Sequence, residues 1–193
     1  MEAAKRVILL LLLGMQGIHA QVMPGERNGL IRAQANLAGG YRFPQKSFAA
    51  YVAADMDIFL SERVSVGGEI WYSLPLDDGP LRQNHAFFAG FNYHPLKQGR
   101  WDPFVGFSPG VALCKIAYED ASGRHSTPLS PAPLFSVAGG CNWYLGSVFH
   151  LFVRLRWAQG QVMGDAPSRT PLQELKISGG LGWNIYSKKA YTH

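Results

Sequence analysis

Cysteine is scarce in this chain, with only Cys114 and Cys141 among its 193 residues. Two isolated thiols are too few for a zinc centre, and no spacing of histidine and cysteine resembles a zinc site. We therefore expect no metal site and no cofactor. The two thiols could form a disulfide in an oxidising compartment, and the strand register considered below bears on that question.

A concentrated run of one charge sign is also missing. The net charge is +5, and the basic residues are scattered along the chain. Nucleic-acid-binding domains instead gather Lys and Arg on one face or along one helix. We expect no nucleic-acid partner.

Long apolar runs are absent after the first residues. Lys5 and Arg6 precede an apolar run over 7–15, and a small residue, Ala20, follows it. This is the layout of a secretory signal peptide cleaved after Ala20, and Gln21 at the next position argues against a lipid-modified N-terminus. No later stretch approaches the 18 apolar residues that indicate a membrane-spanning helix, so any membrane insertion must use strands.

The mature chain does contain a regular series of segments in which apolar and polar residues alternate. Helical spacing of apolar residues is absent, and glycines within nearly every segment would be unfavourable in helices. The class is all-β. The eight predicted strands cover 30–43, 48–60, 63–74, 84–95, 103–118, 132–145, 148–160 and 172–186.

The length of these segments discriminates between soluble and membrane barrels. Globular strands usually have about five or six residues, whereas membrane-spanning strands need about nine to eleven. Mostly tight connections at 61–62, 95–102 and 146–147 alternate with longer connections at 74–83, 119–131 and 161–171. Short turns at one end and longer loops at the other are typical of outer-membrane barrels, although the short connection 44–47 departs from this rule.

Each segment has one apolar and one polar face. The second segment, for example, sets Val52, Met56 and Ile58 against Asp55 and Asp57. In a secreted lipocalin-like barrel the apolar face would point inward. Apolar faces that continue over nearly the whole strand, together with mid-strand charges opposite them, favour a transmembrane barrel with apolar faces toward lipid and a polar lumen. Aromatic residues near both ends of the strands indicate two interface girdles: Tyr41, Phe43, Tyr72 and Trp157 at the long-loop end, and Tyr93, Trp101, Trp143, Trp183 and Tyr186 at the short-turn end.

The polar faces carry balanced charges. The segment HLFVRLRWA (150–158) shows the pattern, with two arginines on the face opposite its Leu and Val residues. An eight-stranded barrel has an interior just wide enough for side chains, so unpaired charges there would each cost several kcal/mol. We predict an ion-pair network that fills the lumen, and expect inward glycines to leave room for the arginines. The network comprises Arg32, Asp55, Asp57, Glu69, Arg154, Arg156, Glu174 and Lys176.

The same strand assignment bears on the cysteines. With the connection 119–131 as the hairpin loop, Cys114 lies opposite a position near Ser136 and Cys141 opposite a position near Pro109. The two would be about 16 Å apart at the rise of a strand. A disulfide needs Cα atoms within about 7 Å, so both thiols are predicted to be free.

These features resemble the small eight-stranded outer-membrane barrels of the OmpA-like/OmpX-like (porin-family) superfamily. The resemblance covers Asn28 to Tyr186. It rests on the strand pattern, on WDPFVGF (101–107), similar to the entry of the family's fifth strand, and on LSERVSVGG (60–68), similar to its tight turn before a Gly-bearing strand. The expected organisation is a signal peptide (1–20), a lead-in (21–29), the barrel (30–186) and a C-terminal tail (187–193).

The last strand also resembles the signal read by the barrel-insertion machinery, since Ser178, Gly180, Trp183 and Ile185 fit its spacing. Barrels of this kind commonly end on an aromatic residue, whereas seven residues follow Tyr186 here. The departure concerns the termination rule rather than the barrel.

The resemblance implies a non-enzymatic protein in the outer membrane of a Gram-negative bacterium, contributing to envelope structure or cell-surface interaction. Three alternatives stay open: a narrow pore, a lipid-modifying barrel enzyme, and the secreted lipocalin-like barrel. For an enzyme, His125 and Ser126 are adjacent with Glu119 and Asp120 nearby, but neighbours in an extended segment point apart, and no catalytic residue is assigned. The expected partners are outer-membrane lipid, the insertion machinery and a surface or host ligand of unspecified chemistry.

Overall fold

The computed structural model describes residues 27–75, 81–97, 99–120, 123–163 and 171–186. The predicted signal peptide, the C-terminal tail and most of two long connections lie outside these ranges. Within them, no helix is long and apolar enough to cross a membrane. The strands are β1 (Leu30–Arg42), β2 (Ser47–Phe59), β3 (Val64–Ser73), β4 (Leu81–Tyr93), β5 (Trp101–Asp120), β6 (Gly123–Ser126), β7 (Ser130–Tyr144), β8 (Phe149–Gln161) and β9 (Pro171–Tyr186).

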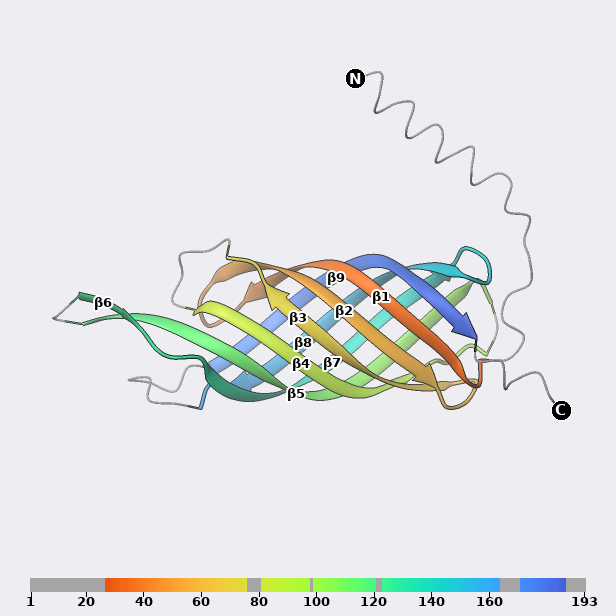
Figure 1. The fold of residues 1–193 in the computed structure, drawn as a ribbon, viewed down its shortest axis with the longest axis horizontal. Coiled ribbons are helices and arrows are strands. Elements are labelled where there is room, and N and C mark those ends of the chain that lie inside the picture. Colours follow the sequence, from red (N-terminus) through yellow and green to blue (C-terminus); the bar gives the residue numbers. More distant parts are fainter. Residues whose placement is uncertain (1–26, 76–80, 98, 121–122, 164–170, 187–193) are drawn as a thin grey trace, which may run out of the picture.

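Eight of these strands close into a barrel (Figure 1). The hydrogen-bonded order is β4-β3-β2-β1-β9-β8-β7-β5, every pairing is antiparallel, and β4 pairs with β5 to close the sheet. The connections after β2, β4 and β7 lie at one end, which we call the turn end. Those after β1, β3, β5 and β8 lie at the other, the loop end.

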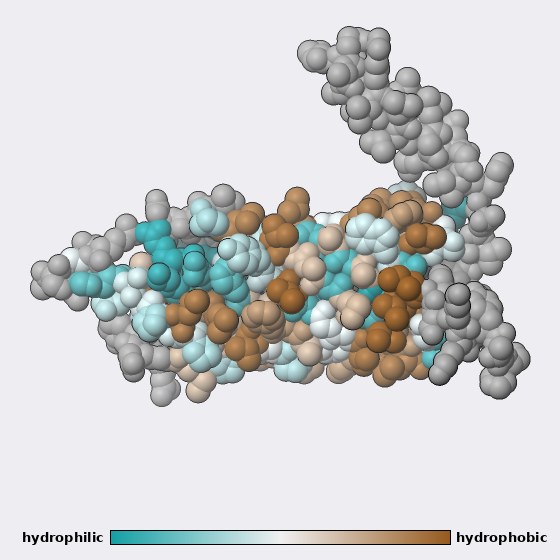
Figure 2. All heavy atoms as spheres, viewed as in Figure 1, coloured by the Kyte–Doolittle hydropathy of each residue, from teal (hydrophilic) through white to brown (hydrophobic). Residues whose placement is uncertain are grey.

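The two faces of each strand are arranged as the alternation predicts. Leu37, Phe48 and Val153 point outward and are 69%, 76% and 57% exposed, whereas the inward Arg32 and Arg156 are each 2% exposed. Figure 2 shows the apolar residues gathered on the outside of the barrel. A soluble barrel would show the opposite arrangement. The predicted fold class, an eight-stranded antiparallel barrel with apolar faces outward, is therefore confirmed.

Aromatic side chains pack together near both ends of the outer surface. At the turn end, the rings of Trp101 and Trp143 are stacked with centroids 5.5 Å apart. At the loop end, Phe43 contacts Trp157 at 5.4 Å. These pairs lie where the two predicted girdles place them.

The prediction that 119–131 forms a single hairpin loop is wrong. β5 continues to Asp120 and forms a hairpin with β6 that extends beyond the barrel, and Asp120 faces Gly123. The hairpin therefore reverses earlier than the middle of 119–131, which shifts the β5–β7 register by six residues. Cys114 faces Ser130 rather than Ser136, and Cys141 faces Pro103 rather than Pro109.

The shift moves the cysteines further apart, because the strand position opposite Cys141 is Pro103, eleven residues before Cys114. Both thiols are free, as predicted. Cys114 is buried inside the barrel, and Cys141 lies half-exposed on the outer face.

The inward glycines allow other groups to approach closely, and Arg154 lines one small cavity together with Gly67 and Gly90. A Cβ at Gly67 would collide with the carbonyl oxygen of Met56, and one at Gly180 with that of Ala35. At these positions glycine allows neighbouring backbones to approach closely. The side chains that occupy the space over other inward glycines include Glu174 at Gly40 and His150 at Gly182, rather than arginines.

Candidate functional site: the charged lumen

The centre of the lumen is crossed by two arginines of β8. Arg154 and Arg156 alternate with outward Val153 and Leu155, so both guanidinium groups point inward. Glu69 of β3 accepts hydrogen bonds from both, from Arg154 Nη1 at 3.1 Å and from Arg156 Nη2. The pairing joins strands on opposite sides of the barrel.

Further partners hold this central group in place. Asp55 of β2 accepts from Arg154 Nη2 at 3.4 Å, and Gln34 accepts from the same nitrogen at 3.0 Å. The indole N–H of Trp71 donates to Glu69 at 3.0 Å. Two charge-assisted bonds to one carboxylate make this the kind of buried network in which loss of one member is costly.

Toward the turn end, a second group forms around Arg32 of β1. Its Nε and Nη2 donate to the two oxygens of Asp57 at 3.0 and 2.6 Å, a bidentate pairing. The Ser65 hydroxyl also donates to Asp57 at 2.9 Å. Nη1 of Arg32 reaches onward to Asp102 of β5 at 3.1 Å.

Asp102 is the most heavily bonded carboxylate of the turn end, and it is fully buried. Besides Arg32, it accepts from Arg27 Nη1 at 2.9 Å, Asn142 Nδ2 at 3.0 Å and the Tyr144 hydroxyl at 3.2 Å. Arg27 precedes β1 and also donates to the carbonyl oxygen of Leu96 at 3.0 Å. Arg27, three residues before the start of β1, thus closes the turn end of the lumen.

A chain of hydrogen bonds at the same end resembles a catalytic triad. His94 Nδ1 lies 2.8 Å from Asp102 Oδ1, and His94 Nε2 lies 3.2 Å from the Ser65 hydroxyl. Burial lowers the pKa of His94, which lies just beyond β4. All three side chains are 0% exposed, and the Ser65 hydroxyl is turned to Asp57, so no substrate carbonyl can reach the serine.

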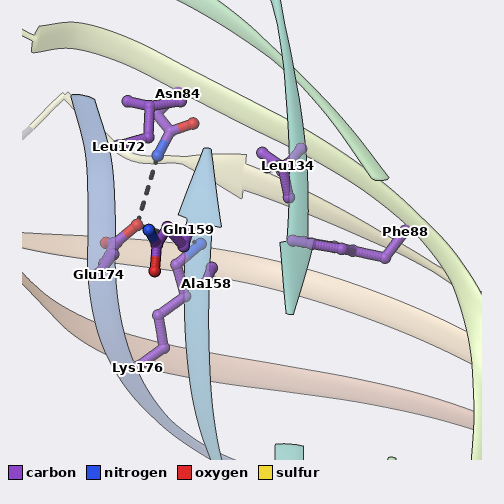
Figure 3. Close-up of a pocket in the computed structure, with 9 residues that line it drawn as sticks. Asn84, Phe88, Leu134, Ala158, Gln159, Leu172, Glu174 and Lys176 are labelled. Carbon is purple, nitrogen blue, oxygen red and sulfur yellow. Dashed lines mark hydrogen bonds and ion pairs between the residues drawn. The ribbon is translucent and has the colours of Figure 1, made fainter. Parts of the chain in front are cut away.

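A third group lies nearer the loop end, around Glu174 of β9. It accepts from the Tyr51 hydroxyl at 2.6 Å and from Asn84 Nδ2 at 3.3 Å, and it pairs with Lys176 at 3.2 Å. Figure 3 shows the bond from Asn84 to Glu174, with Lys176 projecting beside them. The ammonium of Lys176 also lies 4.2 Å from the centre of the Tyr51 ring, a cation–π contact.

Apolar side chains gather in the part of the lumen nearest the loop end, which the alternation does not predict. Its buried side chains include Leu81, Ala86, Ala112, Cys114, Ile116, Ala132, Ala158, Val162 and Leu172. The cavity drawn in Figure 3, at the boundary of this layer, has only about 10 Å³ for the centre of a water molecule. That is about enough for one water.

All eight charged residues of the predicted network lie on the inner face and make ion pairs with one another or with neighbours. The predicted network omits three further inward charges and two buried histidines: Arg27, Arg42, His94, Asp102 and His150. Parity could have identified two of the charges, since Arg42 shares a face with Arg32, and Asp102 with Phe104. No periodic signal marks Arg27.

The predicted insertion-signal residues divide between the faces of β9. Ser178 and Gly180 lie on the inner side, whereas Trp183 and Ile185 point outward and are 40% and 52% exposed. Their recognition by the insertion machinery stays a prediction. The candidate enzyme pair, His125 and Ser126, consists of successive residues of β6, whose side chains therefore point to opposite faces of the hairpin.

No protein-family model and no curated protein sequence matches the chain. Several solved structures do match it. Neisserial surface protein A (NspA) has a TM-score of 0.61 at 10% identity, covering 84% of this chain and 100% of its own. The fold is that of the small outer-membrane β-barrels.

Two further barrels agree with this result. The N-terminal β-barrel domain of Pseudomonas aeruginosa OprF has a TM-score of 0.56 at 13% identity, covering 82% of this chain and 98% of its own. Ail, the attachment invasion locus protein of Yersinia pestis, gives 0.53 at 8% identity, with 82% and 99% covered. The resemblance to eight-stranded outer-membrane barrels inferred from the sequence is confirmed at the level of the fold.

Proposed function

We propose that this protein is a non-enzymatic barrel of the outer membrane of a Gram-negative bacterium, with a plugged lumen, and that it contributes to envelope structure or to cell-surface interaction. The outward apolar belt supports insertion into outer-membrane lipid. Delivery requires cleavage after Ala20 and reading of the β9 signal by the barrel-insertion machinery. Both steps are part of the proposal.

The observation that carries this proposal is the bonding of Glu69 to Arg154 and Arg156 across the lumen. A barrel of eight strands has little interior beyond the volume of its side chains. Here the centre is occupied by paired charges, and the turn end by the Arg27–Asp102 pair. We therefore expect no continuous water column along this axis.

The first experiment tests the barrel itself. Mature protein, purified in detergent, is run on electrophoresis with and without boiling. We expect faster migration of the unboiled sample, because a closed barrel resists detergent and stays compact. Equal mobility, combined with solubility in plain buffer, would refute membrane insertion and favour the secreted lipocalin-like barrel.

The second experiment tests the plug and the absence of catalysis. Protein that shows the mobility shift is reconstituted in planar bilayers and, separately, incubated with lipid A and phospholipid. We expect no conductance steps in the bilayer and no hydrolysis or modification of either lipid. Stable conductance steps would favour the narrow pore, and turnover that survives repurification would favour the lipid-modifying enzyme.

A further inference from the structure

The outward face of the barrel strands carries almost no charge. Among the described side chains of the eight barrel strands, two charged ones depart from this rule, Arg82 of β4 and Lys115 of β5. Both are half-exposed, both are basic, and both lie at the loop end. Lys115 makes no ion pair with any residue that the structure describes, whereas Arg82 has an interaction of its own.

A β-bulge brings these two residues together. Leu81 faces Ile116 and Gln83 faces Lys115, so the register shifts by one residue between Leu81 and Gln83. Two residues of the bulged strand, Arg82 and Gln83, therefore stand opposite the single residue Lys115. The bulge therefore places Arg82 next to the strand position opposite Lys115.

The residues below this pair form a graded series toward the centre of the barrel. Next to it, the Tyr72 ring stacks on His85 with centroids 4.3 Å apart, and Tyr72 is 56% exposed. One step further, Phe87 and Val111 are opposite each other and about half exposed. Membrane proteins show the same order of residues from the hydrocarbon core outward: apolar residues first, then aromatic residues, then cationic residues.

The outward faces of β8 and β9 lack this cationic step. At the corresponding height on β8 and β9, Trp157 faces Leu175, and beyond them Gln159 faces Gln173, all of them uncharged. Figure 2 shows hydrophilic residues gathered at the loop end of the β4–β5 side, adjoining the apolar belt. A localised pair of cations favours a discrete ligand over general attraction to an anionic surface.

We propose that Arg82 and Lys115 bind a phosphate group of a lipid in the outer leaflet, whose acyl chains lie along Phe87 and Val111. The guanidinium of Arg82 suits two phosphate oxygens at once, and Lys115 adds a point charge. Tyr72 and His85 lie at the depth between headgroup and chains. This inference rests on the proposed function, since it requires the loop end to face the outer leaflet.

The test uses the full mature barrel in mixed micelles, titrated with bis-phosphorylated lipid A and, separately, with the same lipid after removal of its phosphates. Bound lipid is counted by native mass spectrometry. We expect wild type to prefer the phosphorylated form and the double variant Arg82→Gln/Lys115→Gln to lose about tenfold in affinity for it. Millimolar inorganic phosphate should not compete.

Two matched variants remove a basic residue elsewhere. Lys97→Gln changes an exposed lysine at the turn end and Lys46→Gln one in the β1–β2 turn, and neither should alter lipid binding. Equal binding of both lipids, equal loss in all variants, or full competition by inorganic phosphate would overturn the site. Wild type and each variant are first checked for the mobility shift on boiling. A wild type without that shift would refute the proposed function, whereas a folded wild type without lipid preference would refute only the site.

Discussion

Asp55 of β2 and Glu69 of β3 are direct register partners, and both carboxylates bind the guanidinium of Arg154 from across the lumen. Two like charges opposite each other on neighbouring strands would repel. The repulsion is offset because Arg154 pairs with both carboxylates and Arg156 pairs with Glu69. The pair of acids on one wall and the pair of arginines on the other form one unit.

We expect Glu69→Ala to be strongly destabilising. The change leaves Arg156 without its carboxylate and Trp71 without its acceptor in a buried site, and breaking one member of such a pair costs about 3–5 kcal/mol. The unfolding midpoint in detergent and denaturant measures it. Glu62→Ala, in a half-exposed turn where it accepts a single backbone N–H from Arg27, is the control and should cost much less. An unchanged midpoint for Glu69→Ala would contradict the plug.

The neighbouring glycines 67 and 68 give a paired test of backbone packing. A Cβ at Gly67 would collide with the backbone of Met56 and Asp57, whereas one at Gly68 would make ordinary contact with Phe88. Overpacking of this kind typically costs about 1–3 kcal/mol. We expect Gly67→Ala to lower the unfolding midpoint and the outward Gly68→Ala to leave it nearly unchanged. Equal effects would show that the close approach of β2 and β3 is not limiting.

The hydrogen-bond chain through Ser65 should be structural. Fluorophosphonate probes, which label activated serines, should not react with the folded barrel because Ser65, His94 and Asp102 are fully buried. Ser65→Ala should cost about 1–3 kcal/mol, since it leaves Asp57 and His94 each without one partner. Labelling that disappears in Ser65→Ala would instead reveal a serine accessible to substrate.

The two thiols should differ in reactivity. In the folded barrel in detergent, maleimide should modify Cys141→Ser protein only after denaturation, because its remaining thiol, Cys114, lies inside the lumen. Cys114→Ser protein, which keeps the half-exposed Cys141, should react faster while folded. Wild type should have the mass of two reduced cysteines without any reductant. A mass two units lower would indicate the disulfide that the register forbids.

Strand number, strand direction and the two faces follow from the sequence because side chains alternate with a period of two, and a whole face is apolar from Val52 to Ile58. The charges in mid-strand follow for the same reason. The β5–β7 register does not, because the hairpin pairs Asp120 with Gly123 near one end of the polar stretch 119–131, which offers further turn-forming residues such as Pro128 and Pro131. Arg27 lies outside the alternating segments, so its place in the lumen depends on closure of the barrel in three dimensions. His94 lies within the predicted strand 84–95 and shares the parity of the inward Asn84 and Phe88.

The Asp102 carboxylate joins Arg27 before the first strand, His94 after the fourth and Asn142 on the seventh. His94 directly follows β4 and Asn142 lies on β7, the strands that pair with β5 in the barrel, but Arg27 precedes β1 on the opposite side of the barrel, so its bond to Asp102 requires the curled sheet. A partly inserted sheet would present the same charges, unpaired, to acyl chains. We therefore expect the Arg27–Asp102 pair to favour the closed barrel over a partly inserted sheet, because an open sheet leaves both charges unpaired in the bilayer.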